Sequence, residues 1–130
     1  MAHILLIEDT PAIRKLVHIQ LEQAGHSVES AEDAEAGLKL AFTGVFDLVL
    51  MDIHLPGMDG LSATRKLKEN PLTRGIPVLA LTAMAMESDK ARILASGCDG
   101  YIAKPIRLQD LLAAVASTLT GMANPPKEDT

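Results

Sequence analysis

The chain alternates short runs of consecutive apolar residues with longer stretches in which apolar residues recur every three or four positions. The first kind of run predicts strands that are buried on both faces, and the second predicts amphipathic helices. Strands are therefore expected at residues 3–7, 47–51, 77–82 and 100–103, with a weaker candidate at 27–30.

Each predicted strand is followed by a predicted helix. Thr10-Pro11 indicates an N-cap with proline in the first turn, and Gly25 indicates the end of that helix. Asp33 and Asp59 are candidate starts of the next two helices. The side chains expected to face inward are Ile13, Leu16, Val17, Leu21 and Ala24; Ala34, Leu38, Ala41 and Phe42; Leu61, Thr64 and Leu67; Ala91, Leu94 and Ala95; and Leu108, Leu111, Leu112, Val115 and Leu119.

This alternation predicts an α/β fold with a mostly or wholly parallel sheet, right-handed crossovers and helices on both faces. The last helix is expected to stop at Gly121, so residues 1–121 form the predicted domain. Residues 122–130 show no apolar periodicity, and we expect a disordered tail or a linker there.

Composition narrows the class of protein. A length of 130 residues suits a single domain, and a net charge of −5 argues against nucleic acid as a direct partner. Cys98 is the only cysteine, which excludes an internal disulfide and suits a reducing compartment. No apolar run is long enough for a membrane span or a signal peptide. We therefore expect a cytoplasmic protein that binds no membrane.

Reactive side chains follow four of the five predicted strands. Glu8 and Asp9 come after the first, Asp52 comes after the third, Thr82 stands at the end of the fourth, and Lys104 follows the fifth. Because the carboxyl ends of parallel strands share one edge of a sheet, these groups should meet in one crevice. Each alone has a structural explanation, such as a solvated strand end or a helix cap. Their shared position favours a functional site.

Three neighbouring carboxylates cannot all ionise at low cost beside a single ammonium, so either the pKa of one of them rises or a cation binds among them. A hard divalent ion with oxygen ligands fits, most readily Mg²⁺, which typically combines one or two carboxylates with waters and a phosphate. Such a site suits phosphoryl transfer, and a carboxylate can itself become an aspartyl phosphate.

Four segments in this order, "LIEDT", "DLVLMDIHLPGMDG", "VLALTA" and "YIAKP", resemble the receiver domain of two-component response regulators, the chemotaxis-regulator type. The resemblance covers residues 4–119. It implies a flavodoxin-like fold, a doubly wound five-stranded parallel sheet of order 2-1-3-4-5 with five flanking helices. It also implies a signalling protein that is not a classical enzyme.

The resemblance implies a role for each site residue. Asp52 would accept the phosphoryl group, and Lys104 would pair with the acyl phosphate. Asp9 would bind Mg²⁺, or Mn²⁺ as the alternative ion, directly, and Glu8 would bind it through a water. Asp52 and the backbone carbonyl of His54 would complete the protein ligands. The bond between Lys104 and the following proline would be cis.

The resemblance also implies a switch. Thr82 would donate its hydroxyl to a phosphoryl oxygen, and Tyr101 would then turn from exposed to buried. These movements would alter the face formed by the fourth helix, fifth strand and fifth helix, where a downstream protein target would bind. The phosphoryl donor would be a sensor histidine kinase or a histidine phosphotransfer protein.

Other classes fit less well. A haloacid-dehalogenase-type phosphohydrolase needs a second Asp where this chain has His54, and a nucleotide-binding turn needs glycines that "EDTPA" lacks. Two alternatives remain open beside the stand-alone regulator that we expect. One is a receiver that docks independently of phosphorylation, and the other is a receiver segment of a hybrid histidine kinase.

Overall fold

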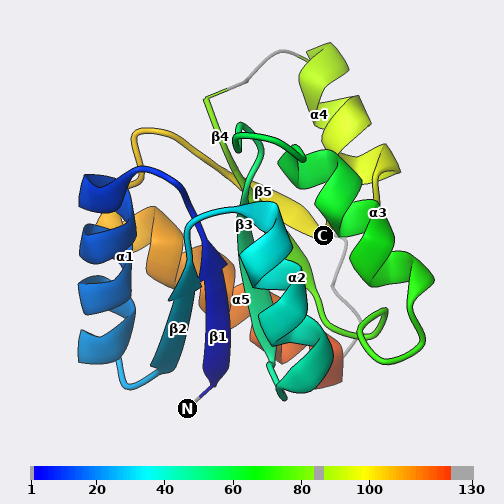
Figure 1. Ribbon diagram of the computed structural model, residues 1–130. Helices are drawn as coiled ribbons and strands as arrows, with labels where there is room; N and C mark the ends of the chain where they lie inside the picture. Colours follow the sequence, from blue (N-terminus) through cyan, green and yellow to red (C-terminus); the bar gives the residue numbers. More distant parts are fainter. Residues whose placement is uncertain (1, 84–86, 124–130) are drawn as a thin grey trace.

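The computed structural model describes residues 2–83 and 87–123. A single sheet of five parallel strands runs through it in the order β2-β1-β3-β4-β5 (Figure 1). The alternation of strands and helices predicts the parallel pairing, and the resemblance implies the strand order; both are confirmed. The strands are β1 (His3–Ile7), β2 (Ser27–Ala31), β3 (Leu48–Asp52), β4 (Val78–Thr82) and β5 (Gly100–Ala103).

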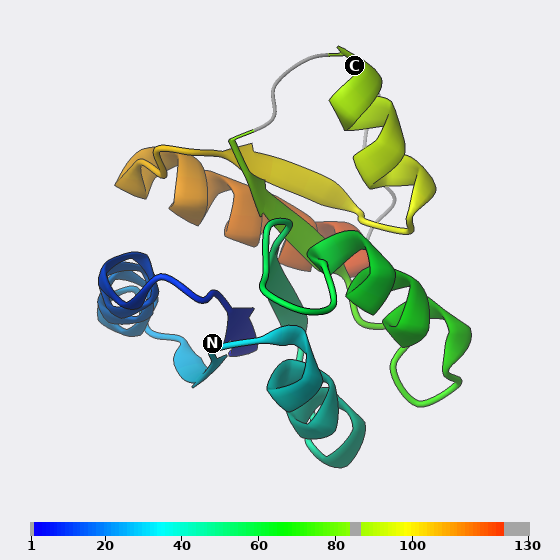
Figure 2. The same ribbon diagram turned by 45° about the horizontal axis from the view of Figure 1, so that its top comes forward.

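Helices cover both faces of the sheet. Side chains of α2, α3 and α4 share one core cluster, and side chains of α1 and α5 share the other. Figure 2 shows α1 and α5 on one side of the strands and α2 and α3 on the opposite side. The helices are α1 (Pro11–Gln23), α2 (Ala34–Thr43), α3 (Gly60–Glu69), α4 (Glu87–Ala95) and α5 (Leu108–Ala123).

The central strands are apolar up to their carboxyl ends because their side chains contribute to both clusters. In β1, Leu5 and Ile7 point to the α2 side, whereas Ile4 and Leu6 point to the α1 side. β3 and β4 are buried at every position. This two-sided burial explains why the sequence shows continuous apolar runs there instead of alternation.

Local signals in the sequence set most of the helix boundaries. Asp33 caps α2 by accepting a 2.8 Å hydrogen bond from the Ala36 amide, and Asp59 caps α3 through Ser62 at the same distance. Gly25, with φ of +99°, follows α1 as predicted. Thr10 occupies the N-cap position of α1, but its side chain makes no capping hydrogen bond.

Several predicted inward faces are wrong in part. Leu16, Leu94 and Leu108 are 50%, 52% and 46% exposed, and Ala91 and Ala95 are exposed as well. In α4 the fully buried side chain is instead Ile93. The apolar side chains of α4 lie on more than one face, so periodicity alone did not identify the buried face.

The described part of α4 ends at Ala95, directly before the predicted stop at Ser96-Gly97, and residues 84–86, where its predicted first turn falls, lie outside the described residues. The end of the last helix differs from prediction. α5 continues past Gly121 to Ala123. Residues 124–130, part of the predicted tail, lie outside the described residues. Within the described ranges, no helix combines the length and apolar character that crossing a membrane requires.

Candidate functional site

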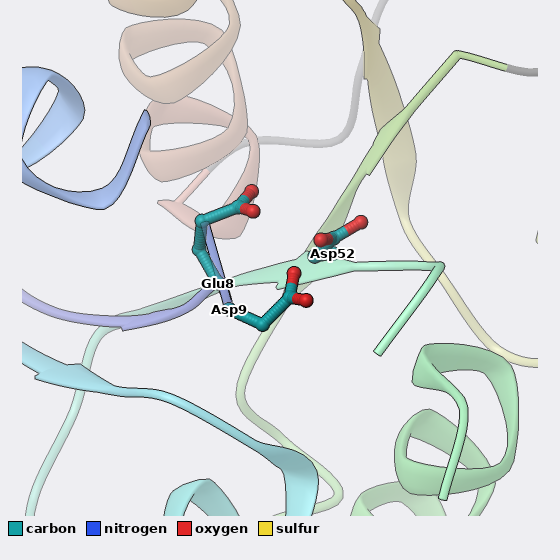
Figure 3. A group of neighbouring side chains, drawn as sticks. All are labelled: Glu8, Asp9 and Asp52. Carbon is teal, nitrogen blue, oxygen red and sulfur yellow. The ribbon is translucent and has the colours of Figure 1, made fainter. Parts of the chain in front are cut away.

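Asp52 is the last residue of β3, the middle strand of the sheet, and it is almost fully buried, with 1% of the residue exposed. β1 and β4 lie on either side of β3, so the groups that follow these strands lie next to Asp52. The structure thus brings the predicted carboxylates together at one sheet edge. Figure 3 shows Glu8, Asp9 and Asp52 gathered where β1 and β3 end.

The three carboxylates form a compact group. One oxygen from each of Glu8, Asp9 and Asp52 lies within 4.8 Å of the others. Glu8 is fully buried, whereas Asp9 is accessible to solvent. The group therefore has a buried side at Glu8 and a solvent-accessible side at Asp9, through which an ion or a phosphoryl group can enter.

Lys104 is the cation of this site. Its Nζ lies 3.3 Å from Asp52 Oδ1 and 3.4 Å from Glu8 Oε1. The amide of Lys104 donates a 2.8 Å hydrogen bond to the carbonyl oxygen of Thr82, which ties the end of β5 to the end of β4. The peptide bond between Lys104 and Pro105 is cis, as the resemblance implies.

The electrostatics of Glu8 reflect this crowding. Burial raises the pKa of Glu8 to about 6, and the neighbouring Asp52 carboxylate adds to the rise. The Thr10 amide, 3.2 Å from Glu8 Oε2, and the Lys104 ammonium oppose it. In the metal-free protein, Glu8 therefore changes charge only a little below neutral pH.

The donor set fits a hard divalent cation. Three carboxylates face a single ammonium, and carboxylate oxygens are the ligands that Mg²⁺ prefers. Glu8 Oε1 is buried and accepts no hydrogen bond from the described residues, although Lys104 is near it. A buried oxygen of this kind would be satisfied by an ion or by water bound to one.

The loop after β3 explains the motif "IHLPGMDG". The His54 amide donates a 3.0 Å hydrogen bond to Asp52 Oδ1, which orients that carboxylate, and the His54 side chain is exposed. The loop then returns to the strand end, where the Gly60 amide donates to the Ile53 carbonyl at 3.0 Å. A Cβ atom at Gly60 would collide with the carbonyl oxygen of Asp52. Only glycine fits this close approach.

The two predicted switch residues lie on the adjoining strands. Thr82 ends β4 and is fully buried. Tyr101, on β5, is half-buried and packs against the core cluster on the α2 side. The Nζ of Lys90, from α4, lies 5.8 Å from the centre of its ring. Tyr101 therefore lies at the boundary between the sheet edge and α4.

Sequence reasoning missed one residue beside the site. Arg14, on α1, donates a 2.9 Å hydrogen bond from Nη1 to the backbone carbonyl of Glu8. The sequence carries no clear signal for this contact, because a basic residue seven positions after a strand end is ordinary on a helix surface. Only the packing of α1 against the sheet shows where the guanidinium lies.

Comparison with protein families supports the assignment that the motifs suggest. A family model described as the response regulator receiver domain matches residues 4–116. Protein PilH of Pseudomonas aeruginosa is 37% identical, over 93% of this chain and 100% of its own length.

Longer relatives match over part of their length. The transcriptional regulator RpaA of Synechocystis is 41% identical over 92% of this chain, and the sensor protein GacS of Pseudomonas syringae is 40% identical over 96%. This chain spans 49% of RpaA and 14% of GacS.

Solved structures agree. A CheY-like receiver domain protein from Methanospirillum hungatei superposes with a TM-score of 0.88 and 31% identity, covering 97% of this chain and 99% of that one. The receiver domain of the sensor histidine kinase PA1611 from Pseudomonas aeruginosa gives a TM-score of 0.85 at 32% identity, covering 92% and 98%. That structure holds a magnesium ion coordinated in its active site cleft.

Proposed function

Because this chain belongs to the response regulator receiver family, we propose that Asp52 accepts a phosphoryl group from a phosphohistidine of a partner protein. The observation that carries the proposal is the placement of Asp52. Its buried carboxylate lies at the end of the middle strand, beside Glu8 and Asp9, the acidic pair that follows β1, and 3.3 Å from the Lys104 ammonium. Such a carboxylate can act as a nucleophile, and the nearby ammonium offsets the negative charge of the phosphoryl group that it accepts.

In the proposed step, an Asp52 carboxylate oxygen forms a bond to phosphorus while the bond between phosphorus and the imidazole nitrogen breaks. The imidazole leaves with the electron pair of that bond and takes a proton from solvent. Lys104, 3.3 Å from Asp52 Oδ1, is placed to pair with the charge that the phosphoryl oxygens bring. The product is an acyl phosphate on Asp52.

Glu8, Asp9, Asp52 and the backbone carbonyl of His54 are the residues that would hold Mg²⁺, with Mn²⁺ as an alternative ion. The ion would neutralise phosphoryl charge, which is the main need of this chemistry. The mutual closeness of the carboxylates supports this set, as does the buried Oε1 of Glu8, which accepts no hydrogen bond from the described part of the chain. The magnesium in the PA1611 receiver domain supports the choice of ion.

The output is a change in a protein-binding surface. We infer that the phosphoryl oxygens favour a conformation in which Thr82 donates to them and Tyr101 becomes fully buried. The link between the Lys104 amide and the Thr82 carbonyl supports coordinated movement of the ends of β4 and β5. Phosphorylation would then shift the equilibrium between two conformations of the face formed by α4, β5 and α5, where a downstream protein binds.

The partners follow from this chemistry. The donor is a sensor histidine kinase or a histidine phosphotransfer protein, and the chain assists its own phosphorylation without being a classical enzyme. A receiver segment of a hybrid histidine kinase is the second candidate, which the similarity to GacS and to the PA1611 receiver favours. Both candidates share the same reaction at Asp52.

The test incubates the purified chain with acetyl phosphate, with and without Mg²⁺, and follows its intact mass. We expect an adduct of one phosphoryl group that requires Mg²⁺, is lost in base and is absent from Asp52→Asn. Asp110→Asn, at an exposed carboxylate in the first turn of α5, is the control and should be modified normally. If neither acetyl phosphate nor a phosphohistidine donor protein labels the chain, the proposal is wrong.

A further inference from the structure

Arg14 contacts the backbone between the two acidic residues of the site. Its Nη1 donates a 2.9 Å hydrogen bond to the carbonyl oxygen of Glu8, and the side chain is largely buried, with 20% of it exposed. The carbonyl of Glu8 and the amide of Asp9 belong to one planar peptide unit. A group that holds this carbonyl therefore also sets the direction in which the chain enters Asp9.

The Glu8 carbonyl lies where the sheet ends. The ladder that joins β1 to β3 reaches only as far as Ile7, which pairs with Met51. On the other side, the Glu8 amide still donates to the Ala31 carbonyl at 3.1 Å, past the last residue of β1. The donor for the Glu8 carbonyl is thus a side chain, and a charged donor makes a stronger bond than a neutral one.

Glu8 is consequently held at three atoms. Ala31 accepts from its amide, the Thr10 amide donates to its Oε2, and Arg14 donates to its carbonyl oxygen. The atom that receives no hydrogen bond from the described residues is Oε1, the oxygen nearest Lys104. The three contacts leave that oxygen available to the site.

Arg14 is itself anchored. Its own amide donates to the Thr10 carbonyl at 2.9 Å in the first turn of α1. Its second terminal nitrogen, Nη2, lies 4.0 Å from Glu32 Oε2, directly after β2. Because Glu32 is largely exposed, that ion pair is weak. The bond to the Glu8 carbonyl is the contact that ties α1 to the acidic pair.

We infer that Arg14 is a positioning residue for the divalent ion. It orients the acidic pair through the peptide between Glu8 and Asp9 and so strengthens Mg²⁺ binding, without touching the ion or the phosphoryl group. This inference rests on the proposed function. Through Arg14, α1 would orient the peptide between Glu8 and Asp9, a role that the residues at the strand ends do not fill.

The inference makes a prediction whose sign is opposite to that of simple electrostatics. Removing a positive charge beside three carboxylates should, by Coulomb's law alone, strengthen the binding of a cation. Loss of an orienting contact outside the ligands should weaken it, typically by about 10- to 100-fold. The direction of the change in Mg²⁺ affinity therefore separates a positioning role from a charge effect.

The experiment measures the Mg²⁺ dissociation constant of the unphosphorylated chain by isothermal titration calorimetry. Arg14→Met removes the donor and the charge but keeps an unbranched side chain, and we expect binding about 10-fold weaker. Lys15→Met, at the exposed neighbouring cation, makes the same charge change and should leave affinity unchanged or slightly higher. Melting temperatures establish that each variant is folded. If Arg14→Met does not fold, Arg14→Leu is used, which also lacks a donor, and the same direction is expected.

Two further readings decide the role. At saturating Mg²⁺, the phosphorylation rate of Arg14→Met should return to that of the wild type, because a positioning residue affects ion occupancy and not the transfer step. In metal-free protein, the NMR amide shift of Asp9 should change in Arg14→Met and not in Lys15→Met. Equal or tighter Mg²⁺ binding in folded Arg14→Met would overturn the role of Arg14 and leave the proposed function standing. If the wild type binds no Mg²⁺, both the role of Arg14 and the proposed function are wrong.

Discussion

The ammonium of Lys104 is shared between two buried carboxylates, lying 3.3 Å from Asp52 Oδ1 and 3.4 Å from Glu8 Oε1. These distances place the positive charge between the two acids. A buried negative charge without a partner is costly, so the pair tolerates burial because Lys104 is there.

Replacement of Lys104 by Met should therefore destabilise the metal-free protein. We expect a loss of about 2 kcal/mol in the free energy of unfolding at pH 7.5, below the usual cost for a fully buried pair because the side chain of Lys104 is 21% exposed. Urea unfolding measures this loss. Lys66→Met, at an exposed cation on α3, should change stability little, and an equal loss in both variants would contradict the assignment.

Glu8 gives the site a defined pH dependence. Its pKa is about 6 in the folded protein against 4.5 for the unperturbed group, so the folded state binds the proton more tightly than the unfolded state. The resulting stabilisation is fully present below pH 4.5 and is lost as the pH rises through about 6. Ionised Glu8 therefore destabilises the metal-free protein at neutral pH.

Glu8→Gln should remove that cost. We expect the variant to be more stable than the wild type by about 2 kcal/mol at pH 7.5 without Mg²⁺, and the difference to shrink as the pH falls. Unfolding curves across this range measure it. Glu69→Gln, at an exposed carboxylate, is the control. A Glu8→Gln variant that is less stable than the wild type at pH 7.5 would show that the charge on Glu8 is not costly.

Gly60 is required by the return of the loop to β3. Gly60→Ala would drive a Cβ atom into the Asp52 carbonyl, and we expect a loss of about 3 kcal/mol because backbone on both sides must move. Gly75→Ala is the matched control. Nothing lies within 4 Å of its added Cβ, so stability should change by less than about 0.5 kcal/mol. Similar losses in both variants would refute the steric explanation.

Cys98 should be chemically inert in the folded state. It is 5% exposed, so a reagent cannot easily reach the sulfur, and burial raises the pKa of the thiol, so little of it is the reactive thiolate. Reaction with a thiol reagent at pH 8 should be slow without urea and fast in urea. Ser117→Cys in a Cys98→Ser background supplies an exposed thiol that should react at once. Rapid labelling of native Cys98 would mean that the interior opens readily.

The sequence predicted what depends on local pattern. Continuous apolar runs identified the strands because β1, β3 and β4 are buried on both faces. Parallel strands share a carboxyl edge, so the convergence of Glu8 and Asp52 with Lys104 followed from their positions. The doubly wound order was implied by the resemblance and is confirmed by the strand pairing.

What the sequence did not predict depends on tertiary contacts. The choice of Ile93 over Leu94 as the buried side chain of α4 depends on how a short helix lies against the sheet. The contact of Arg14 with the Glu8 carbonyl needs the angle of α1 as well as its helical period. Helical periodicity gives the relative directions of side chains on one helix, but not which direction meets the sheet.

The central claim is tested most directly by transfer from a phosphohistidine. A donor protein labelled on histidine is mixed with the chain and Mg²⁺, and the position of the label is followed over time for the wild type and for Asp52→Asn. The account predicts that label leaves the histidine and appears on the wild-type chain in a base-labile form, but never on Asp52→Asn. Equal labelling of the folded Asp52→Asn variant would contradict it.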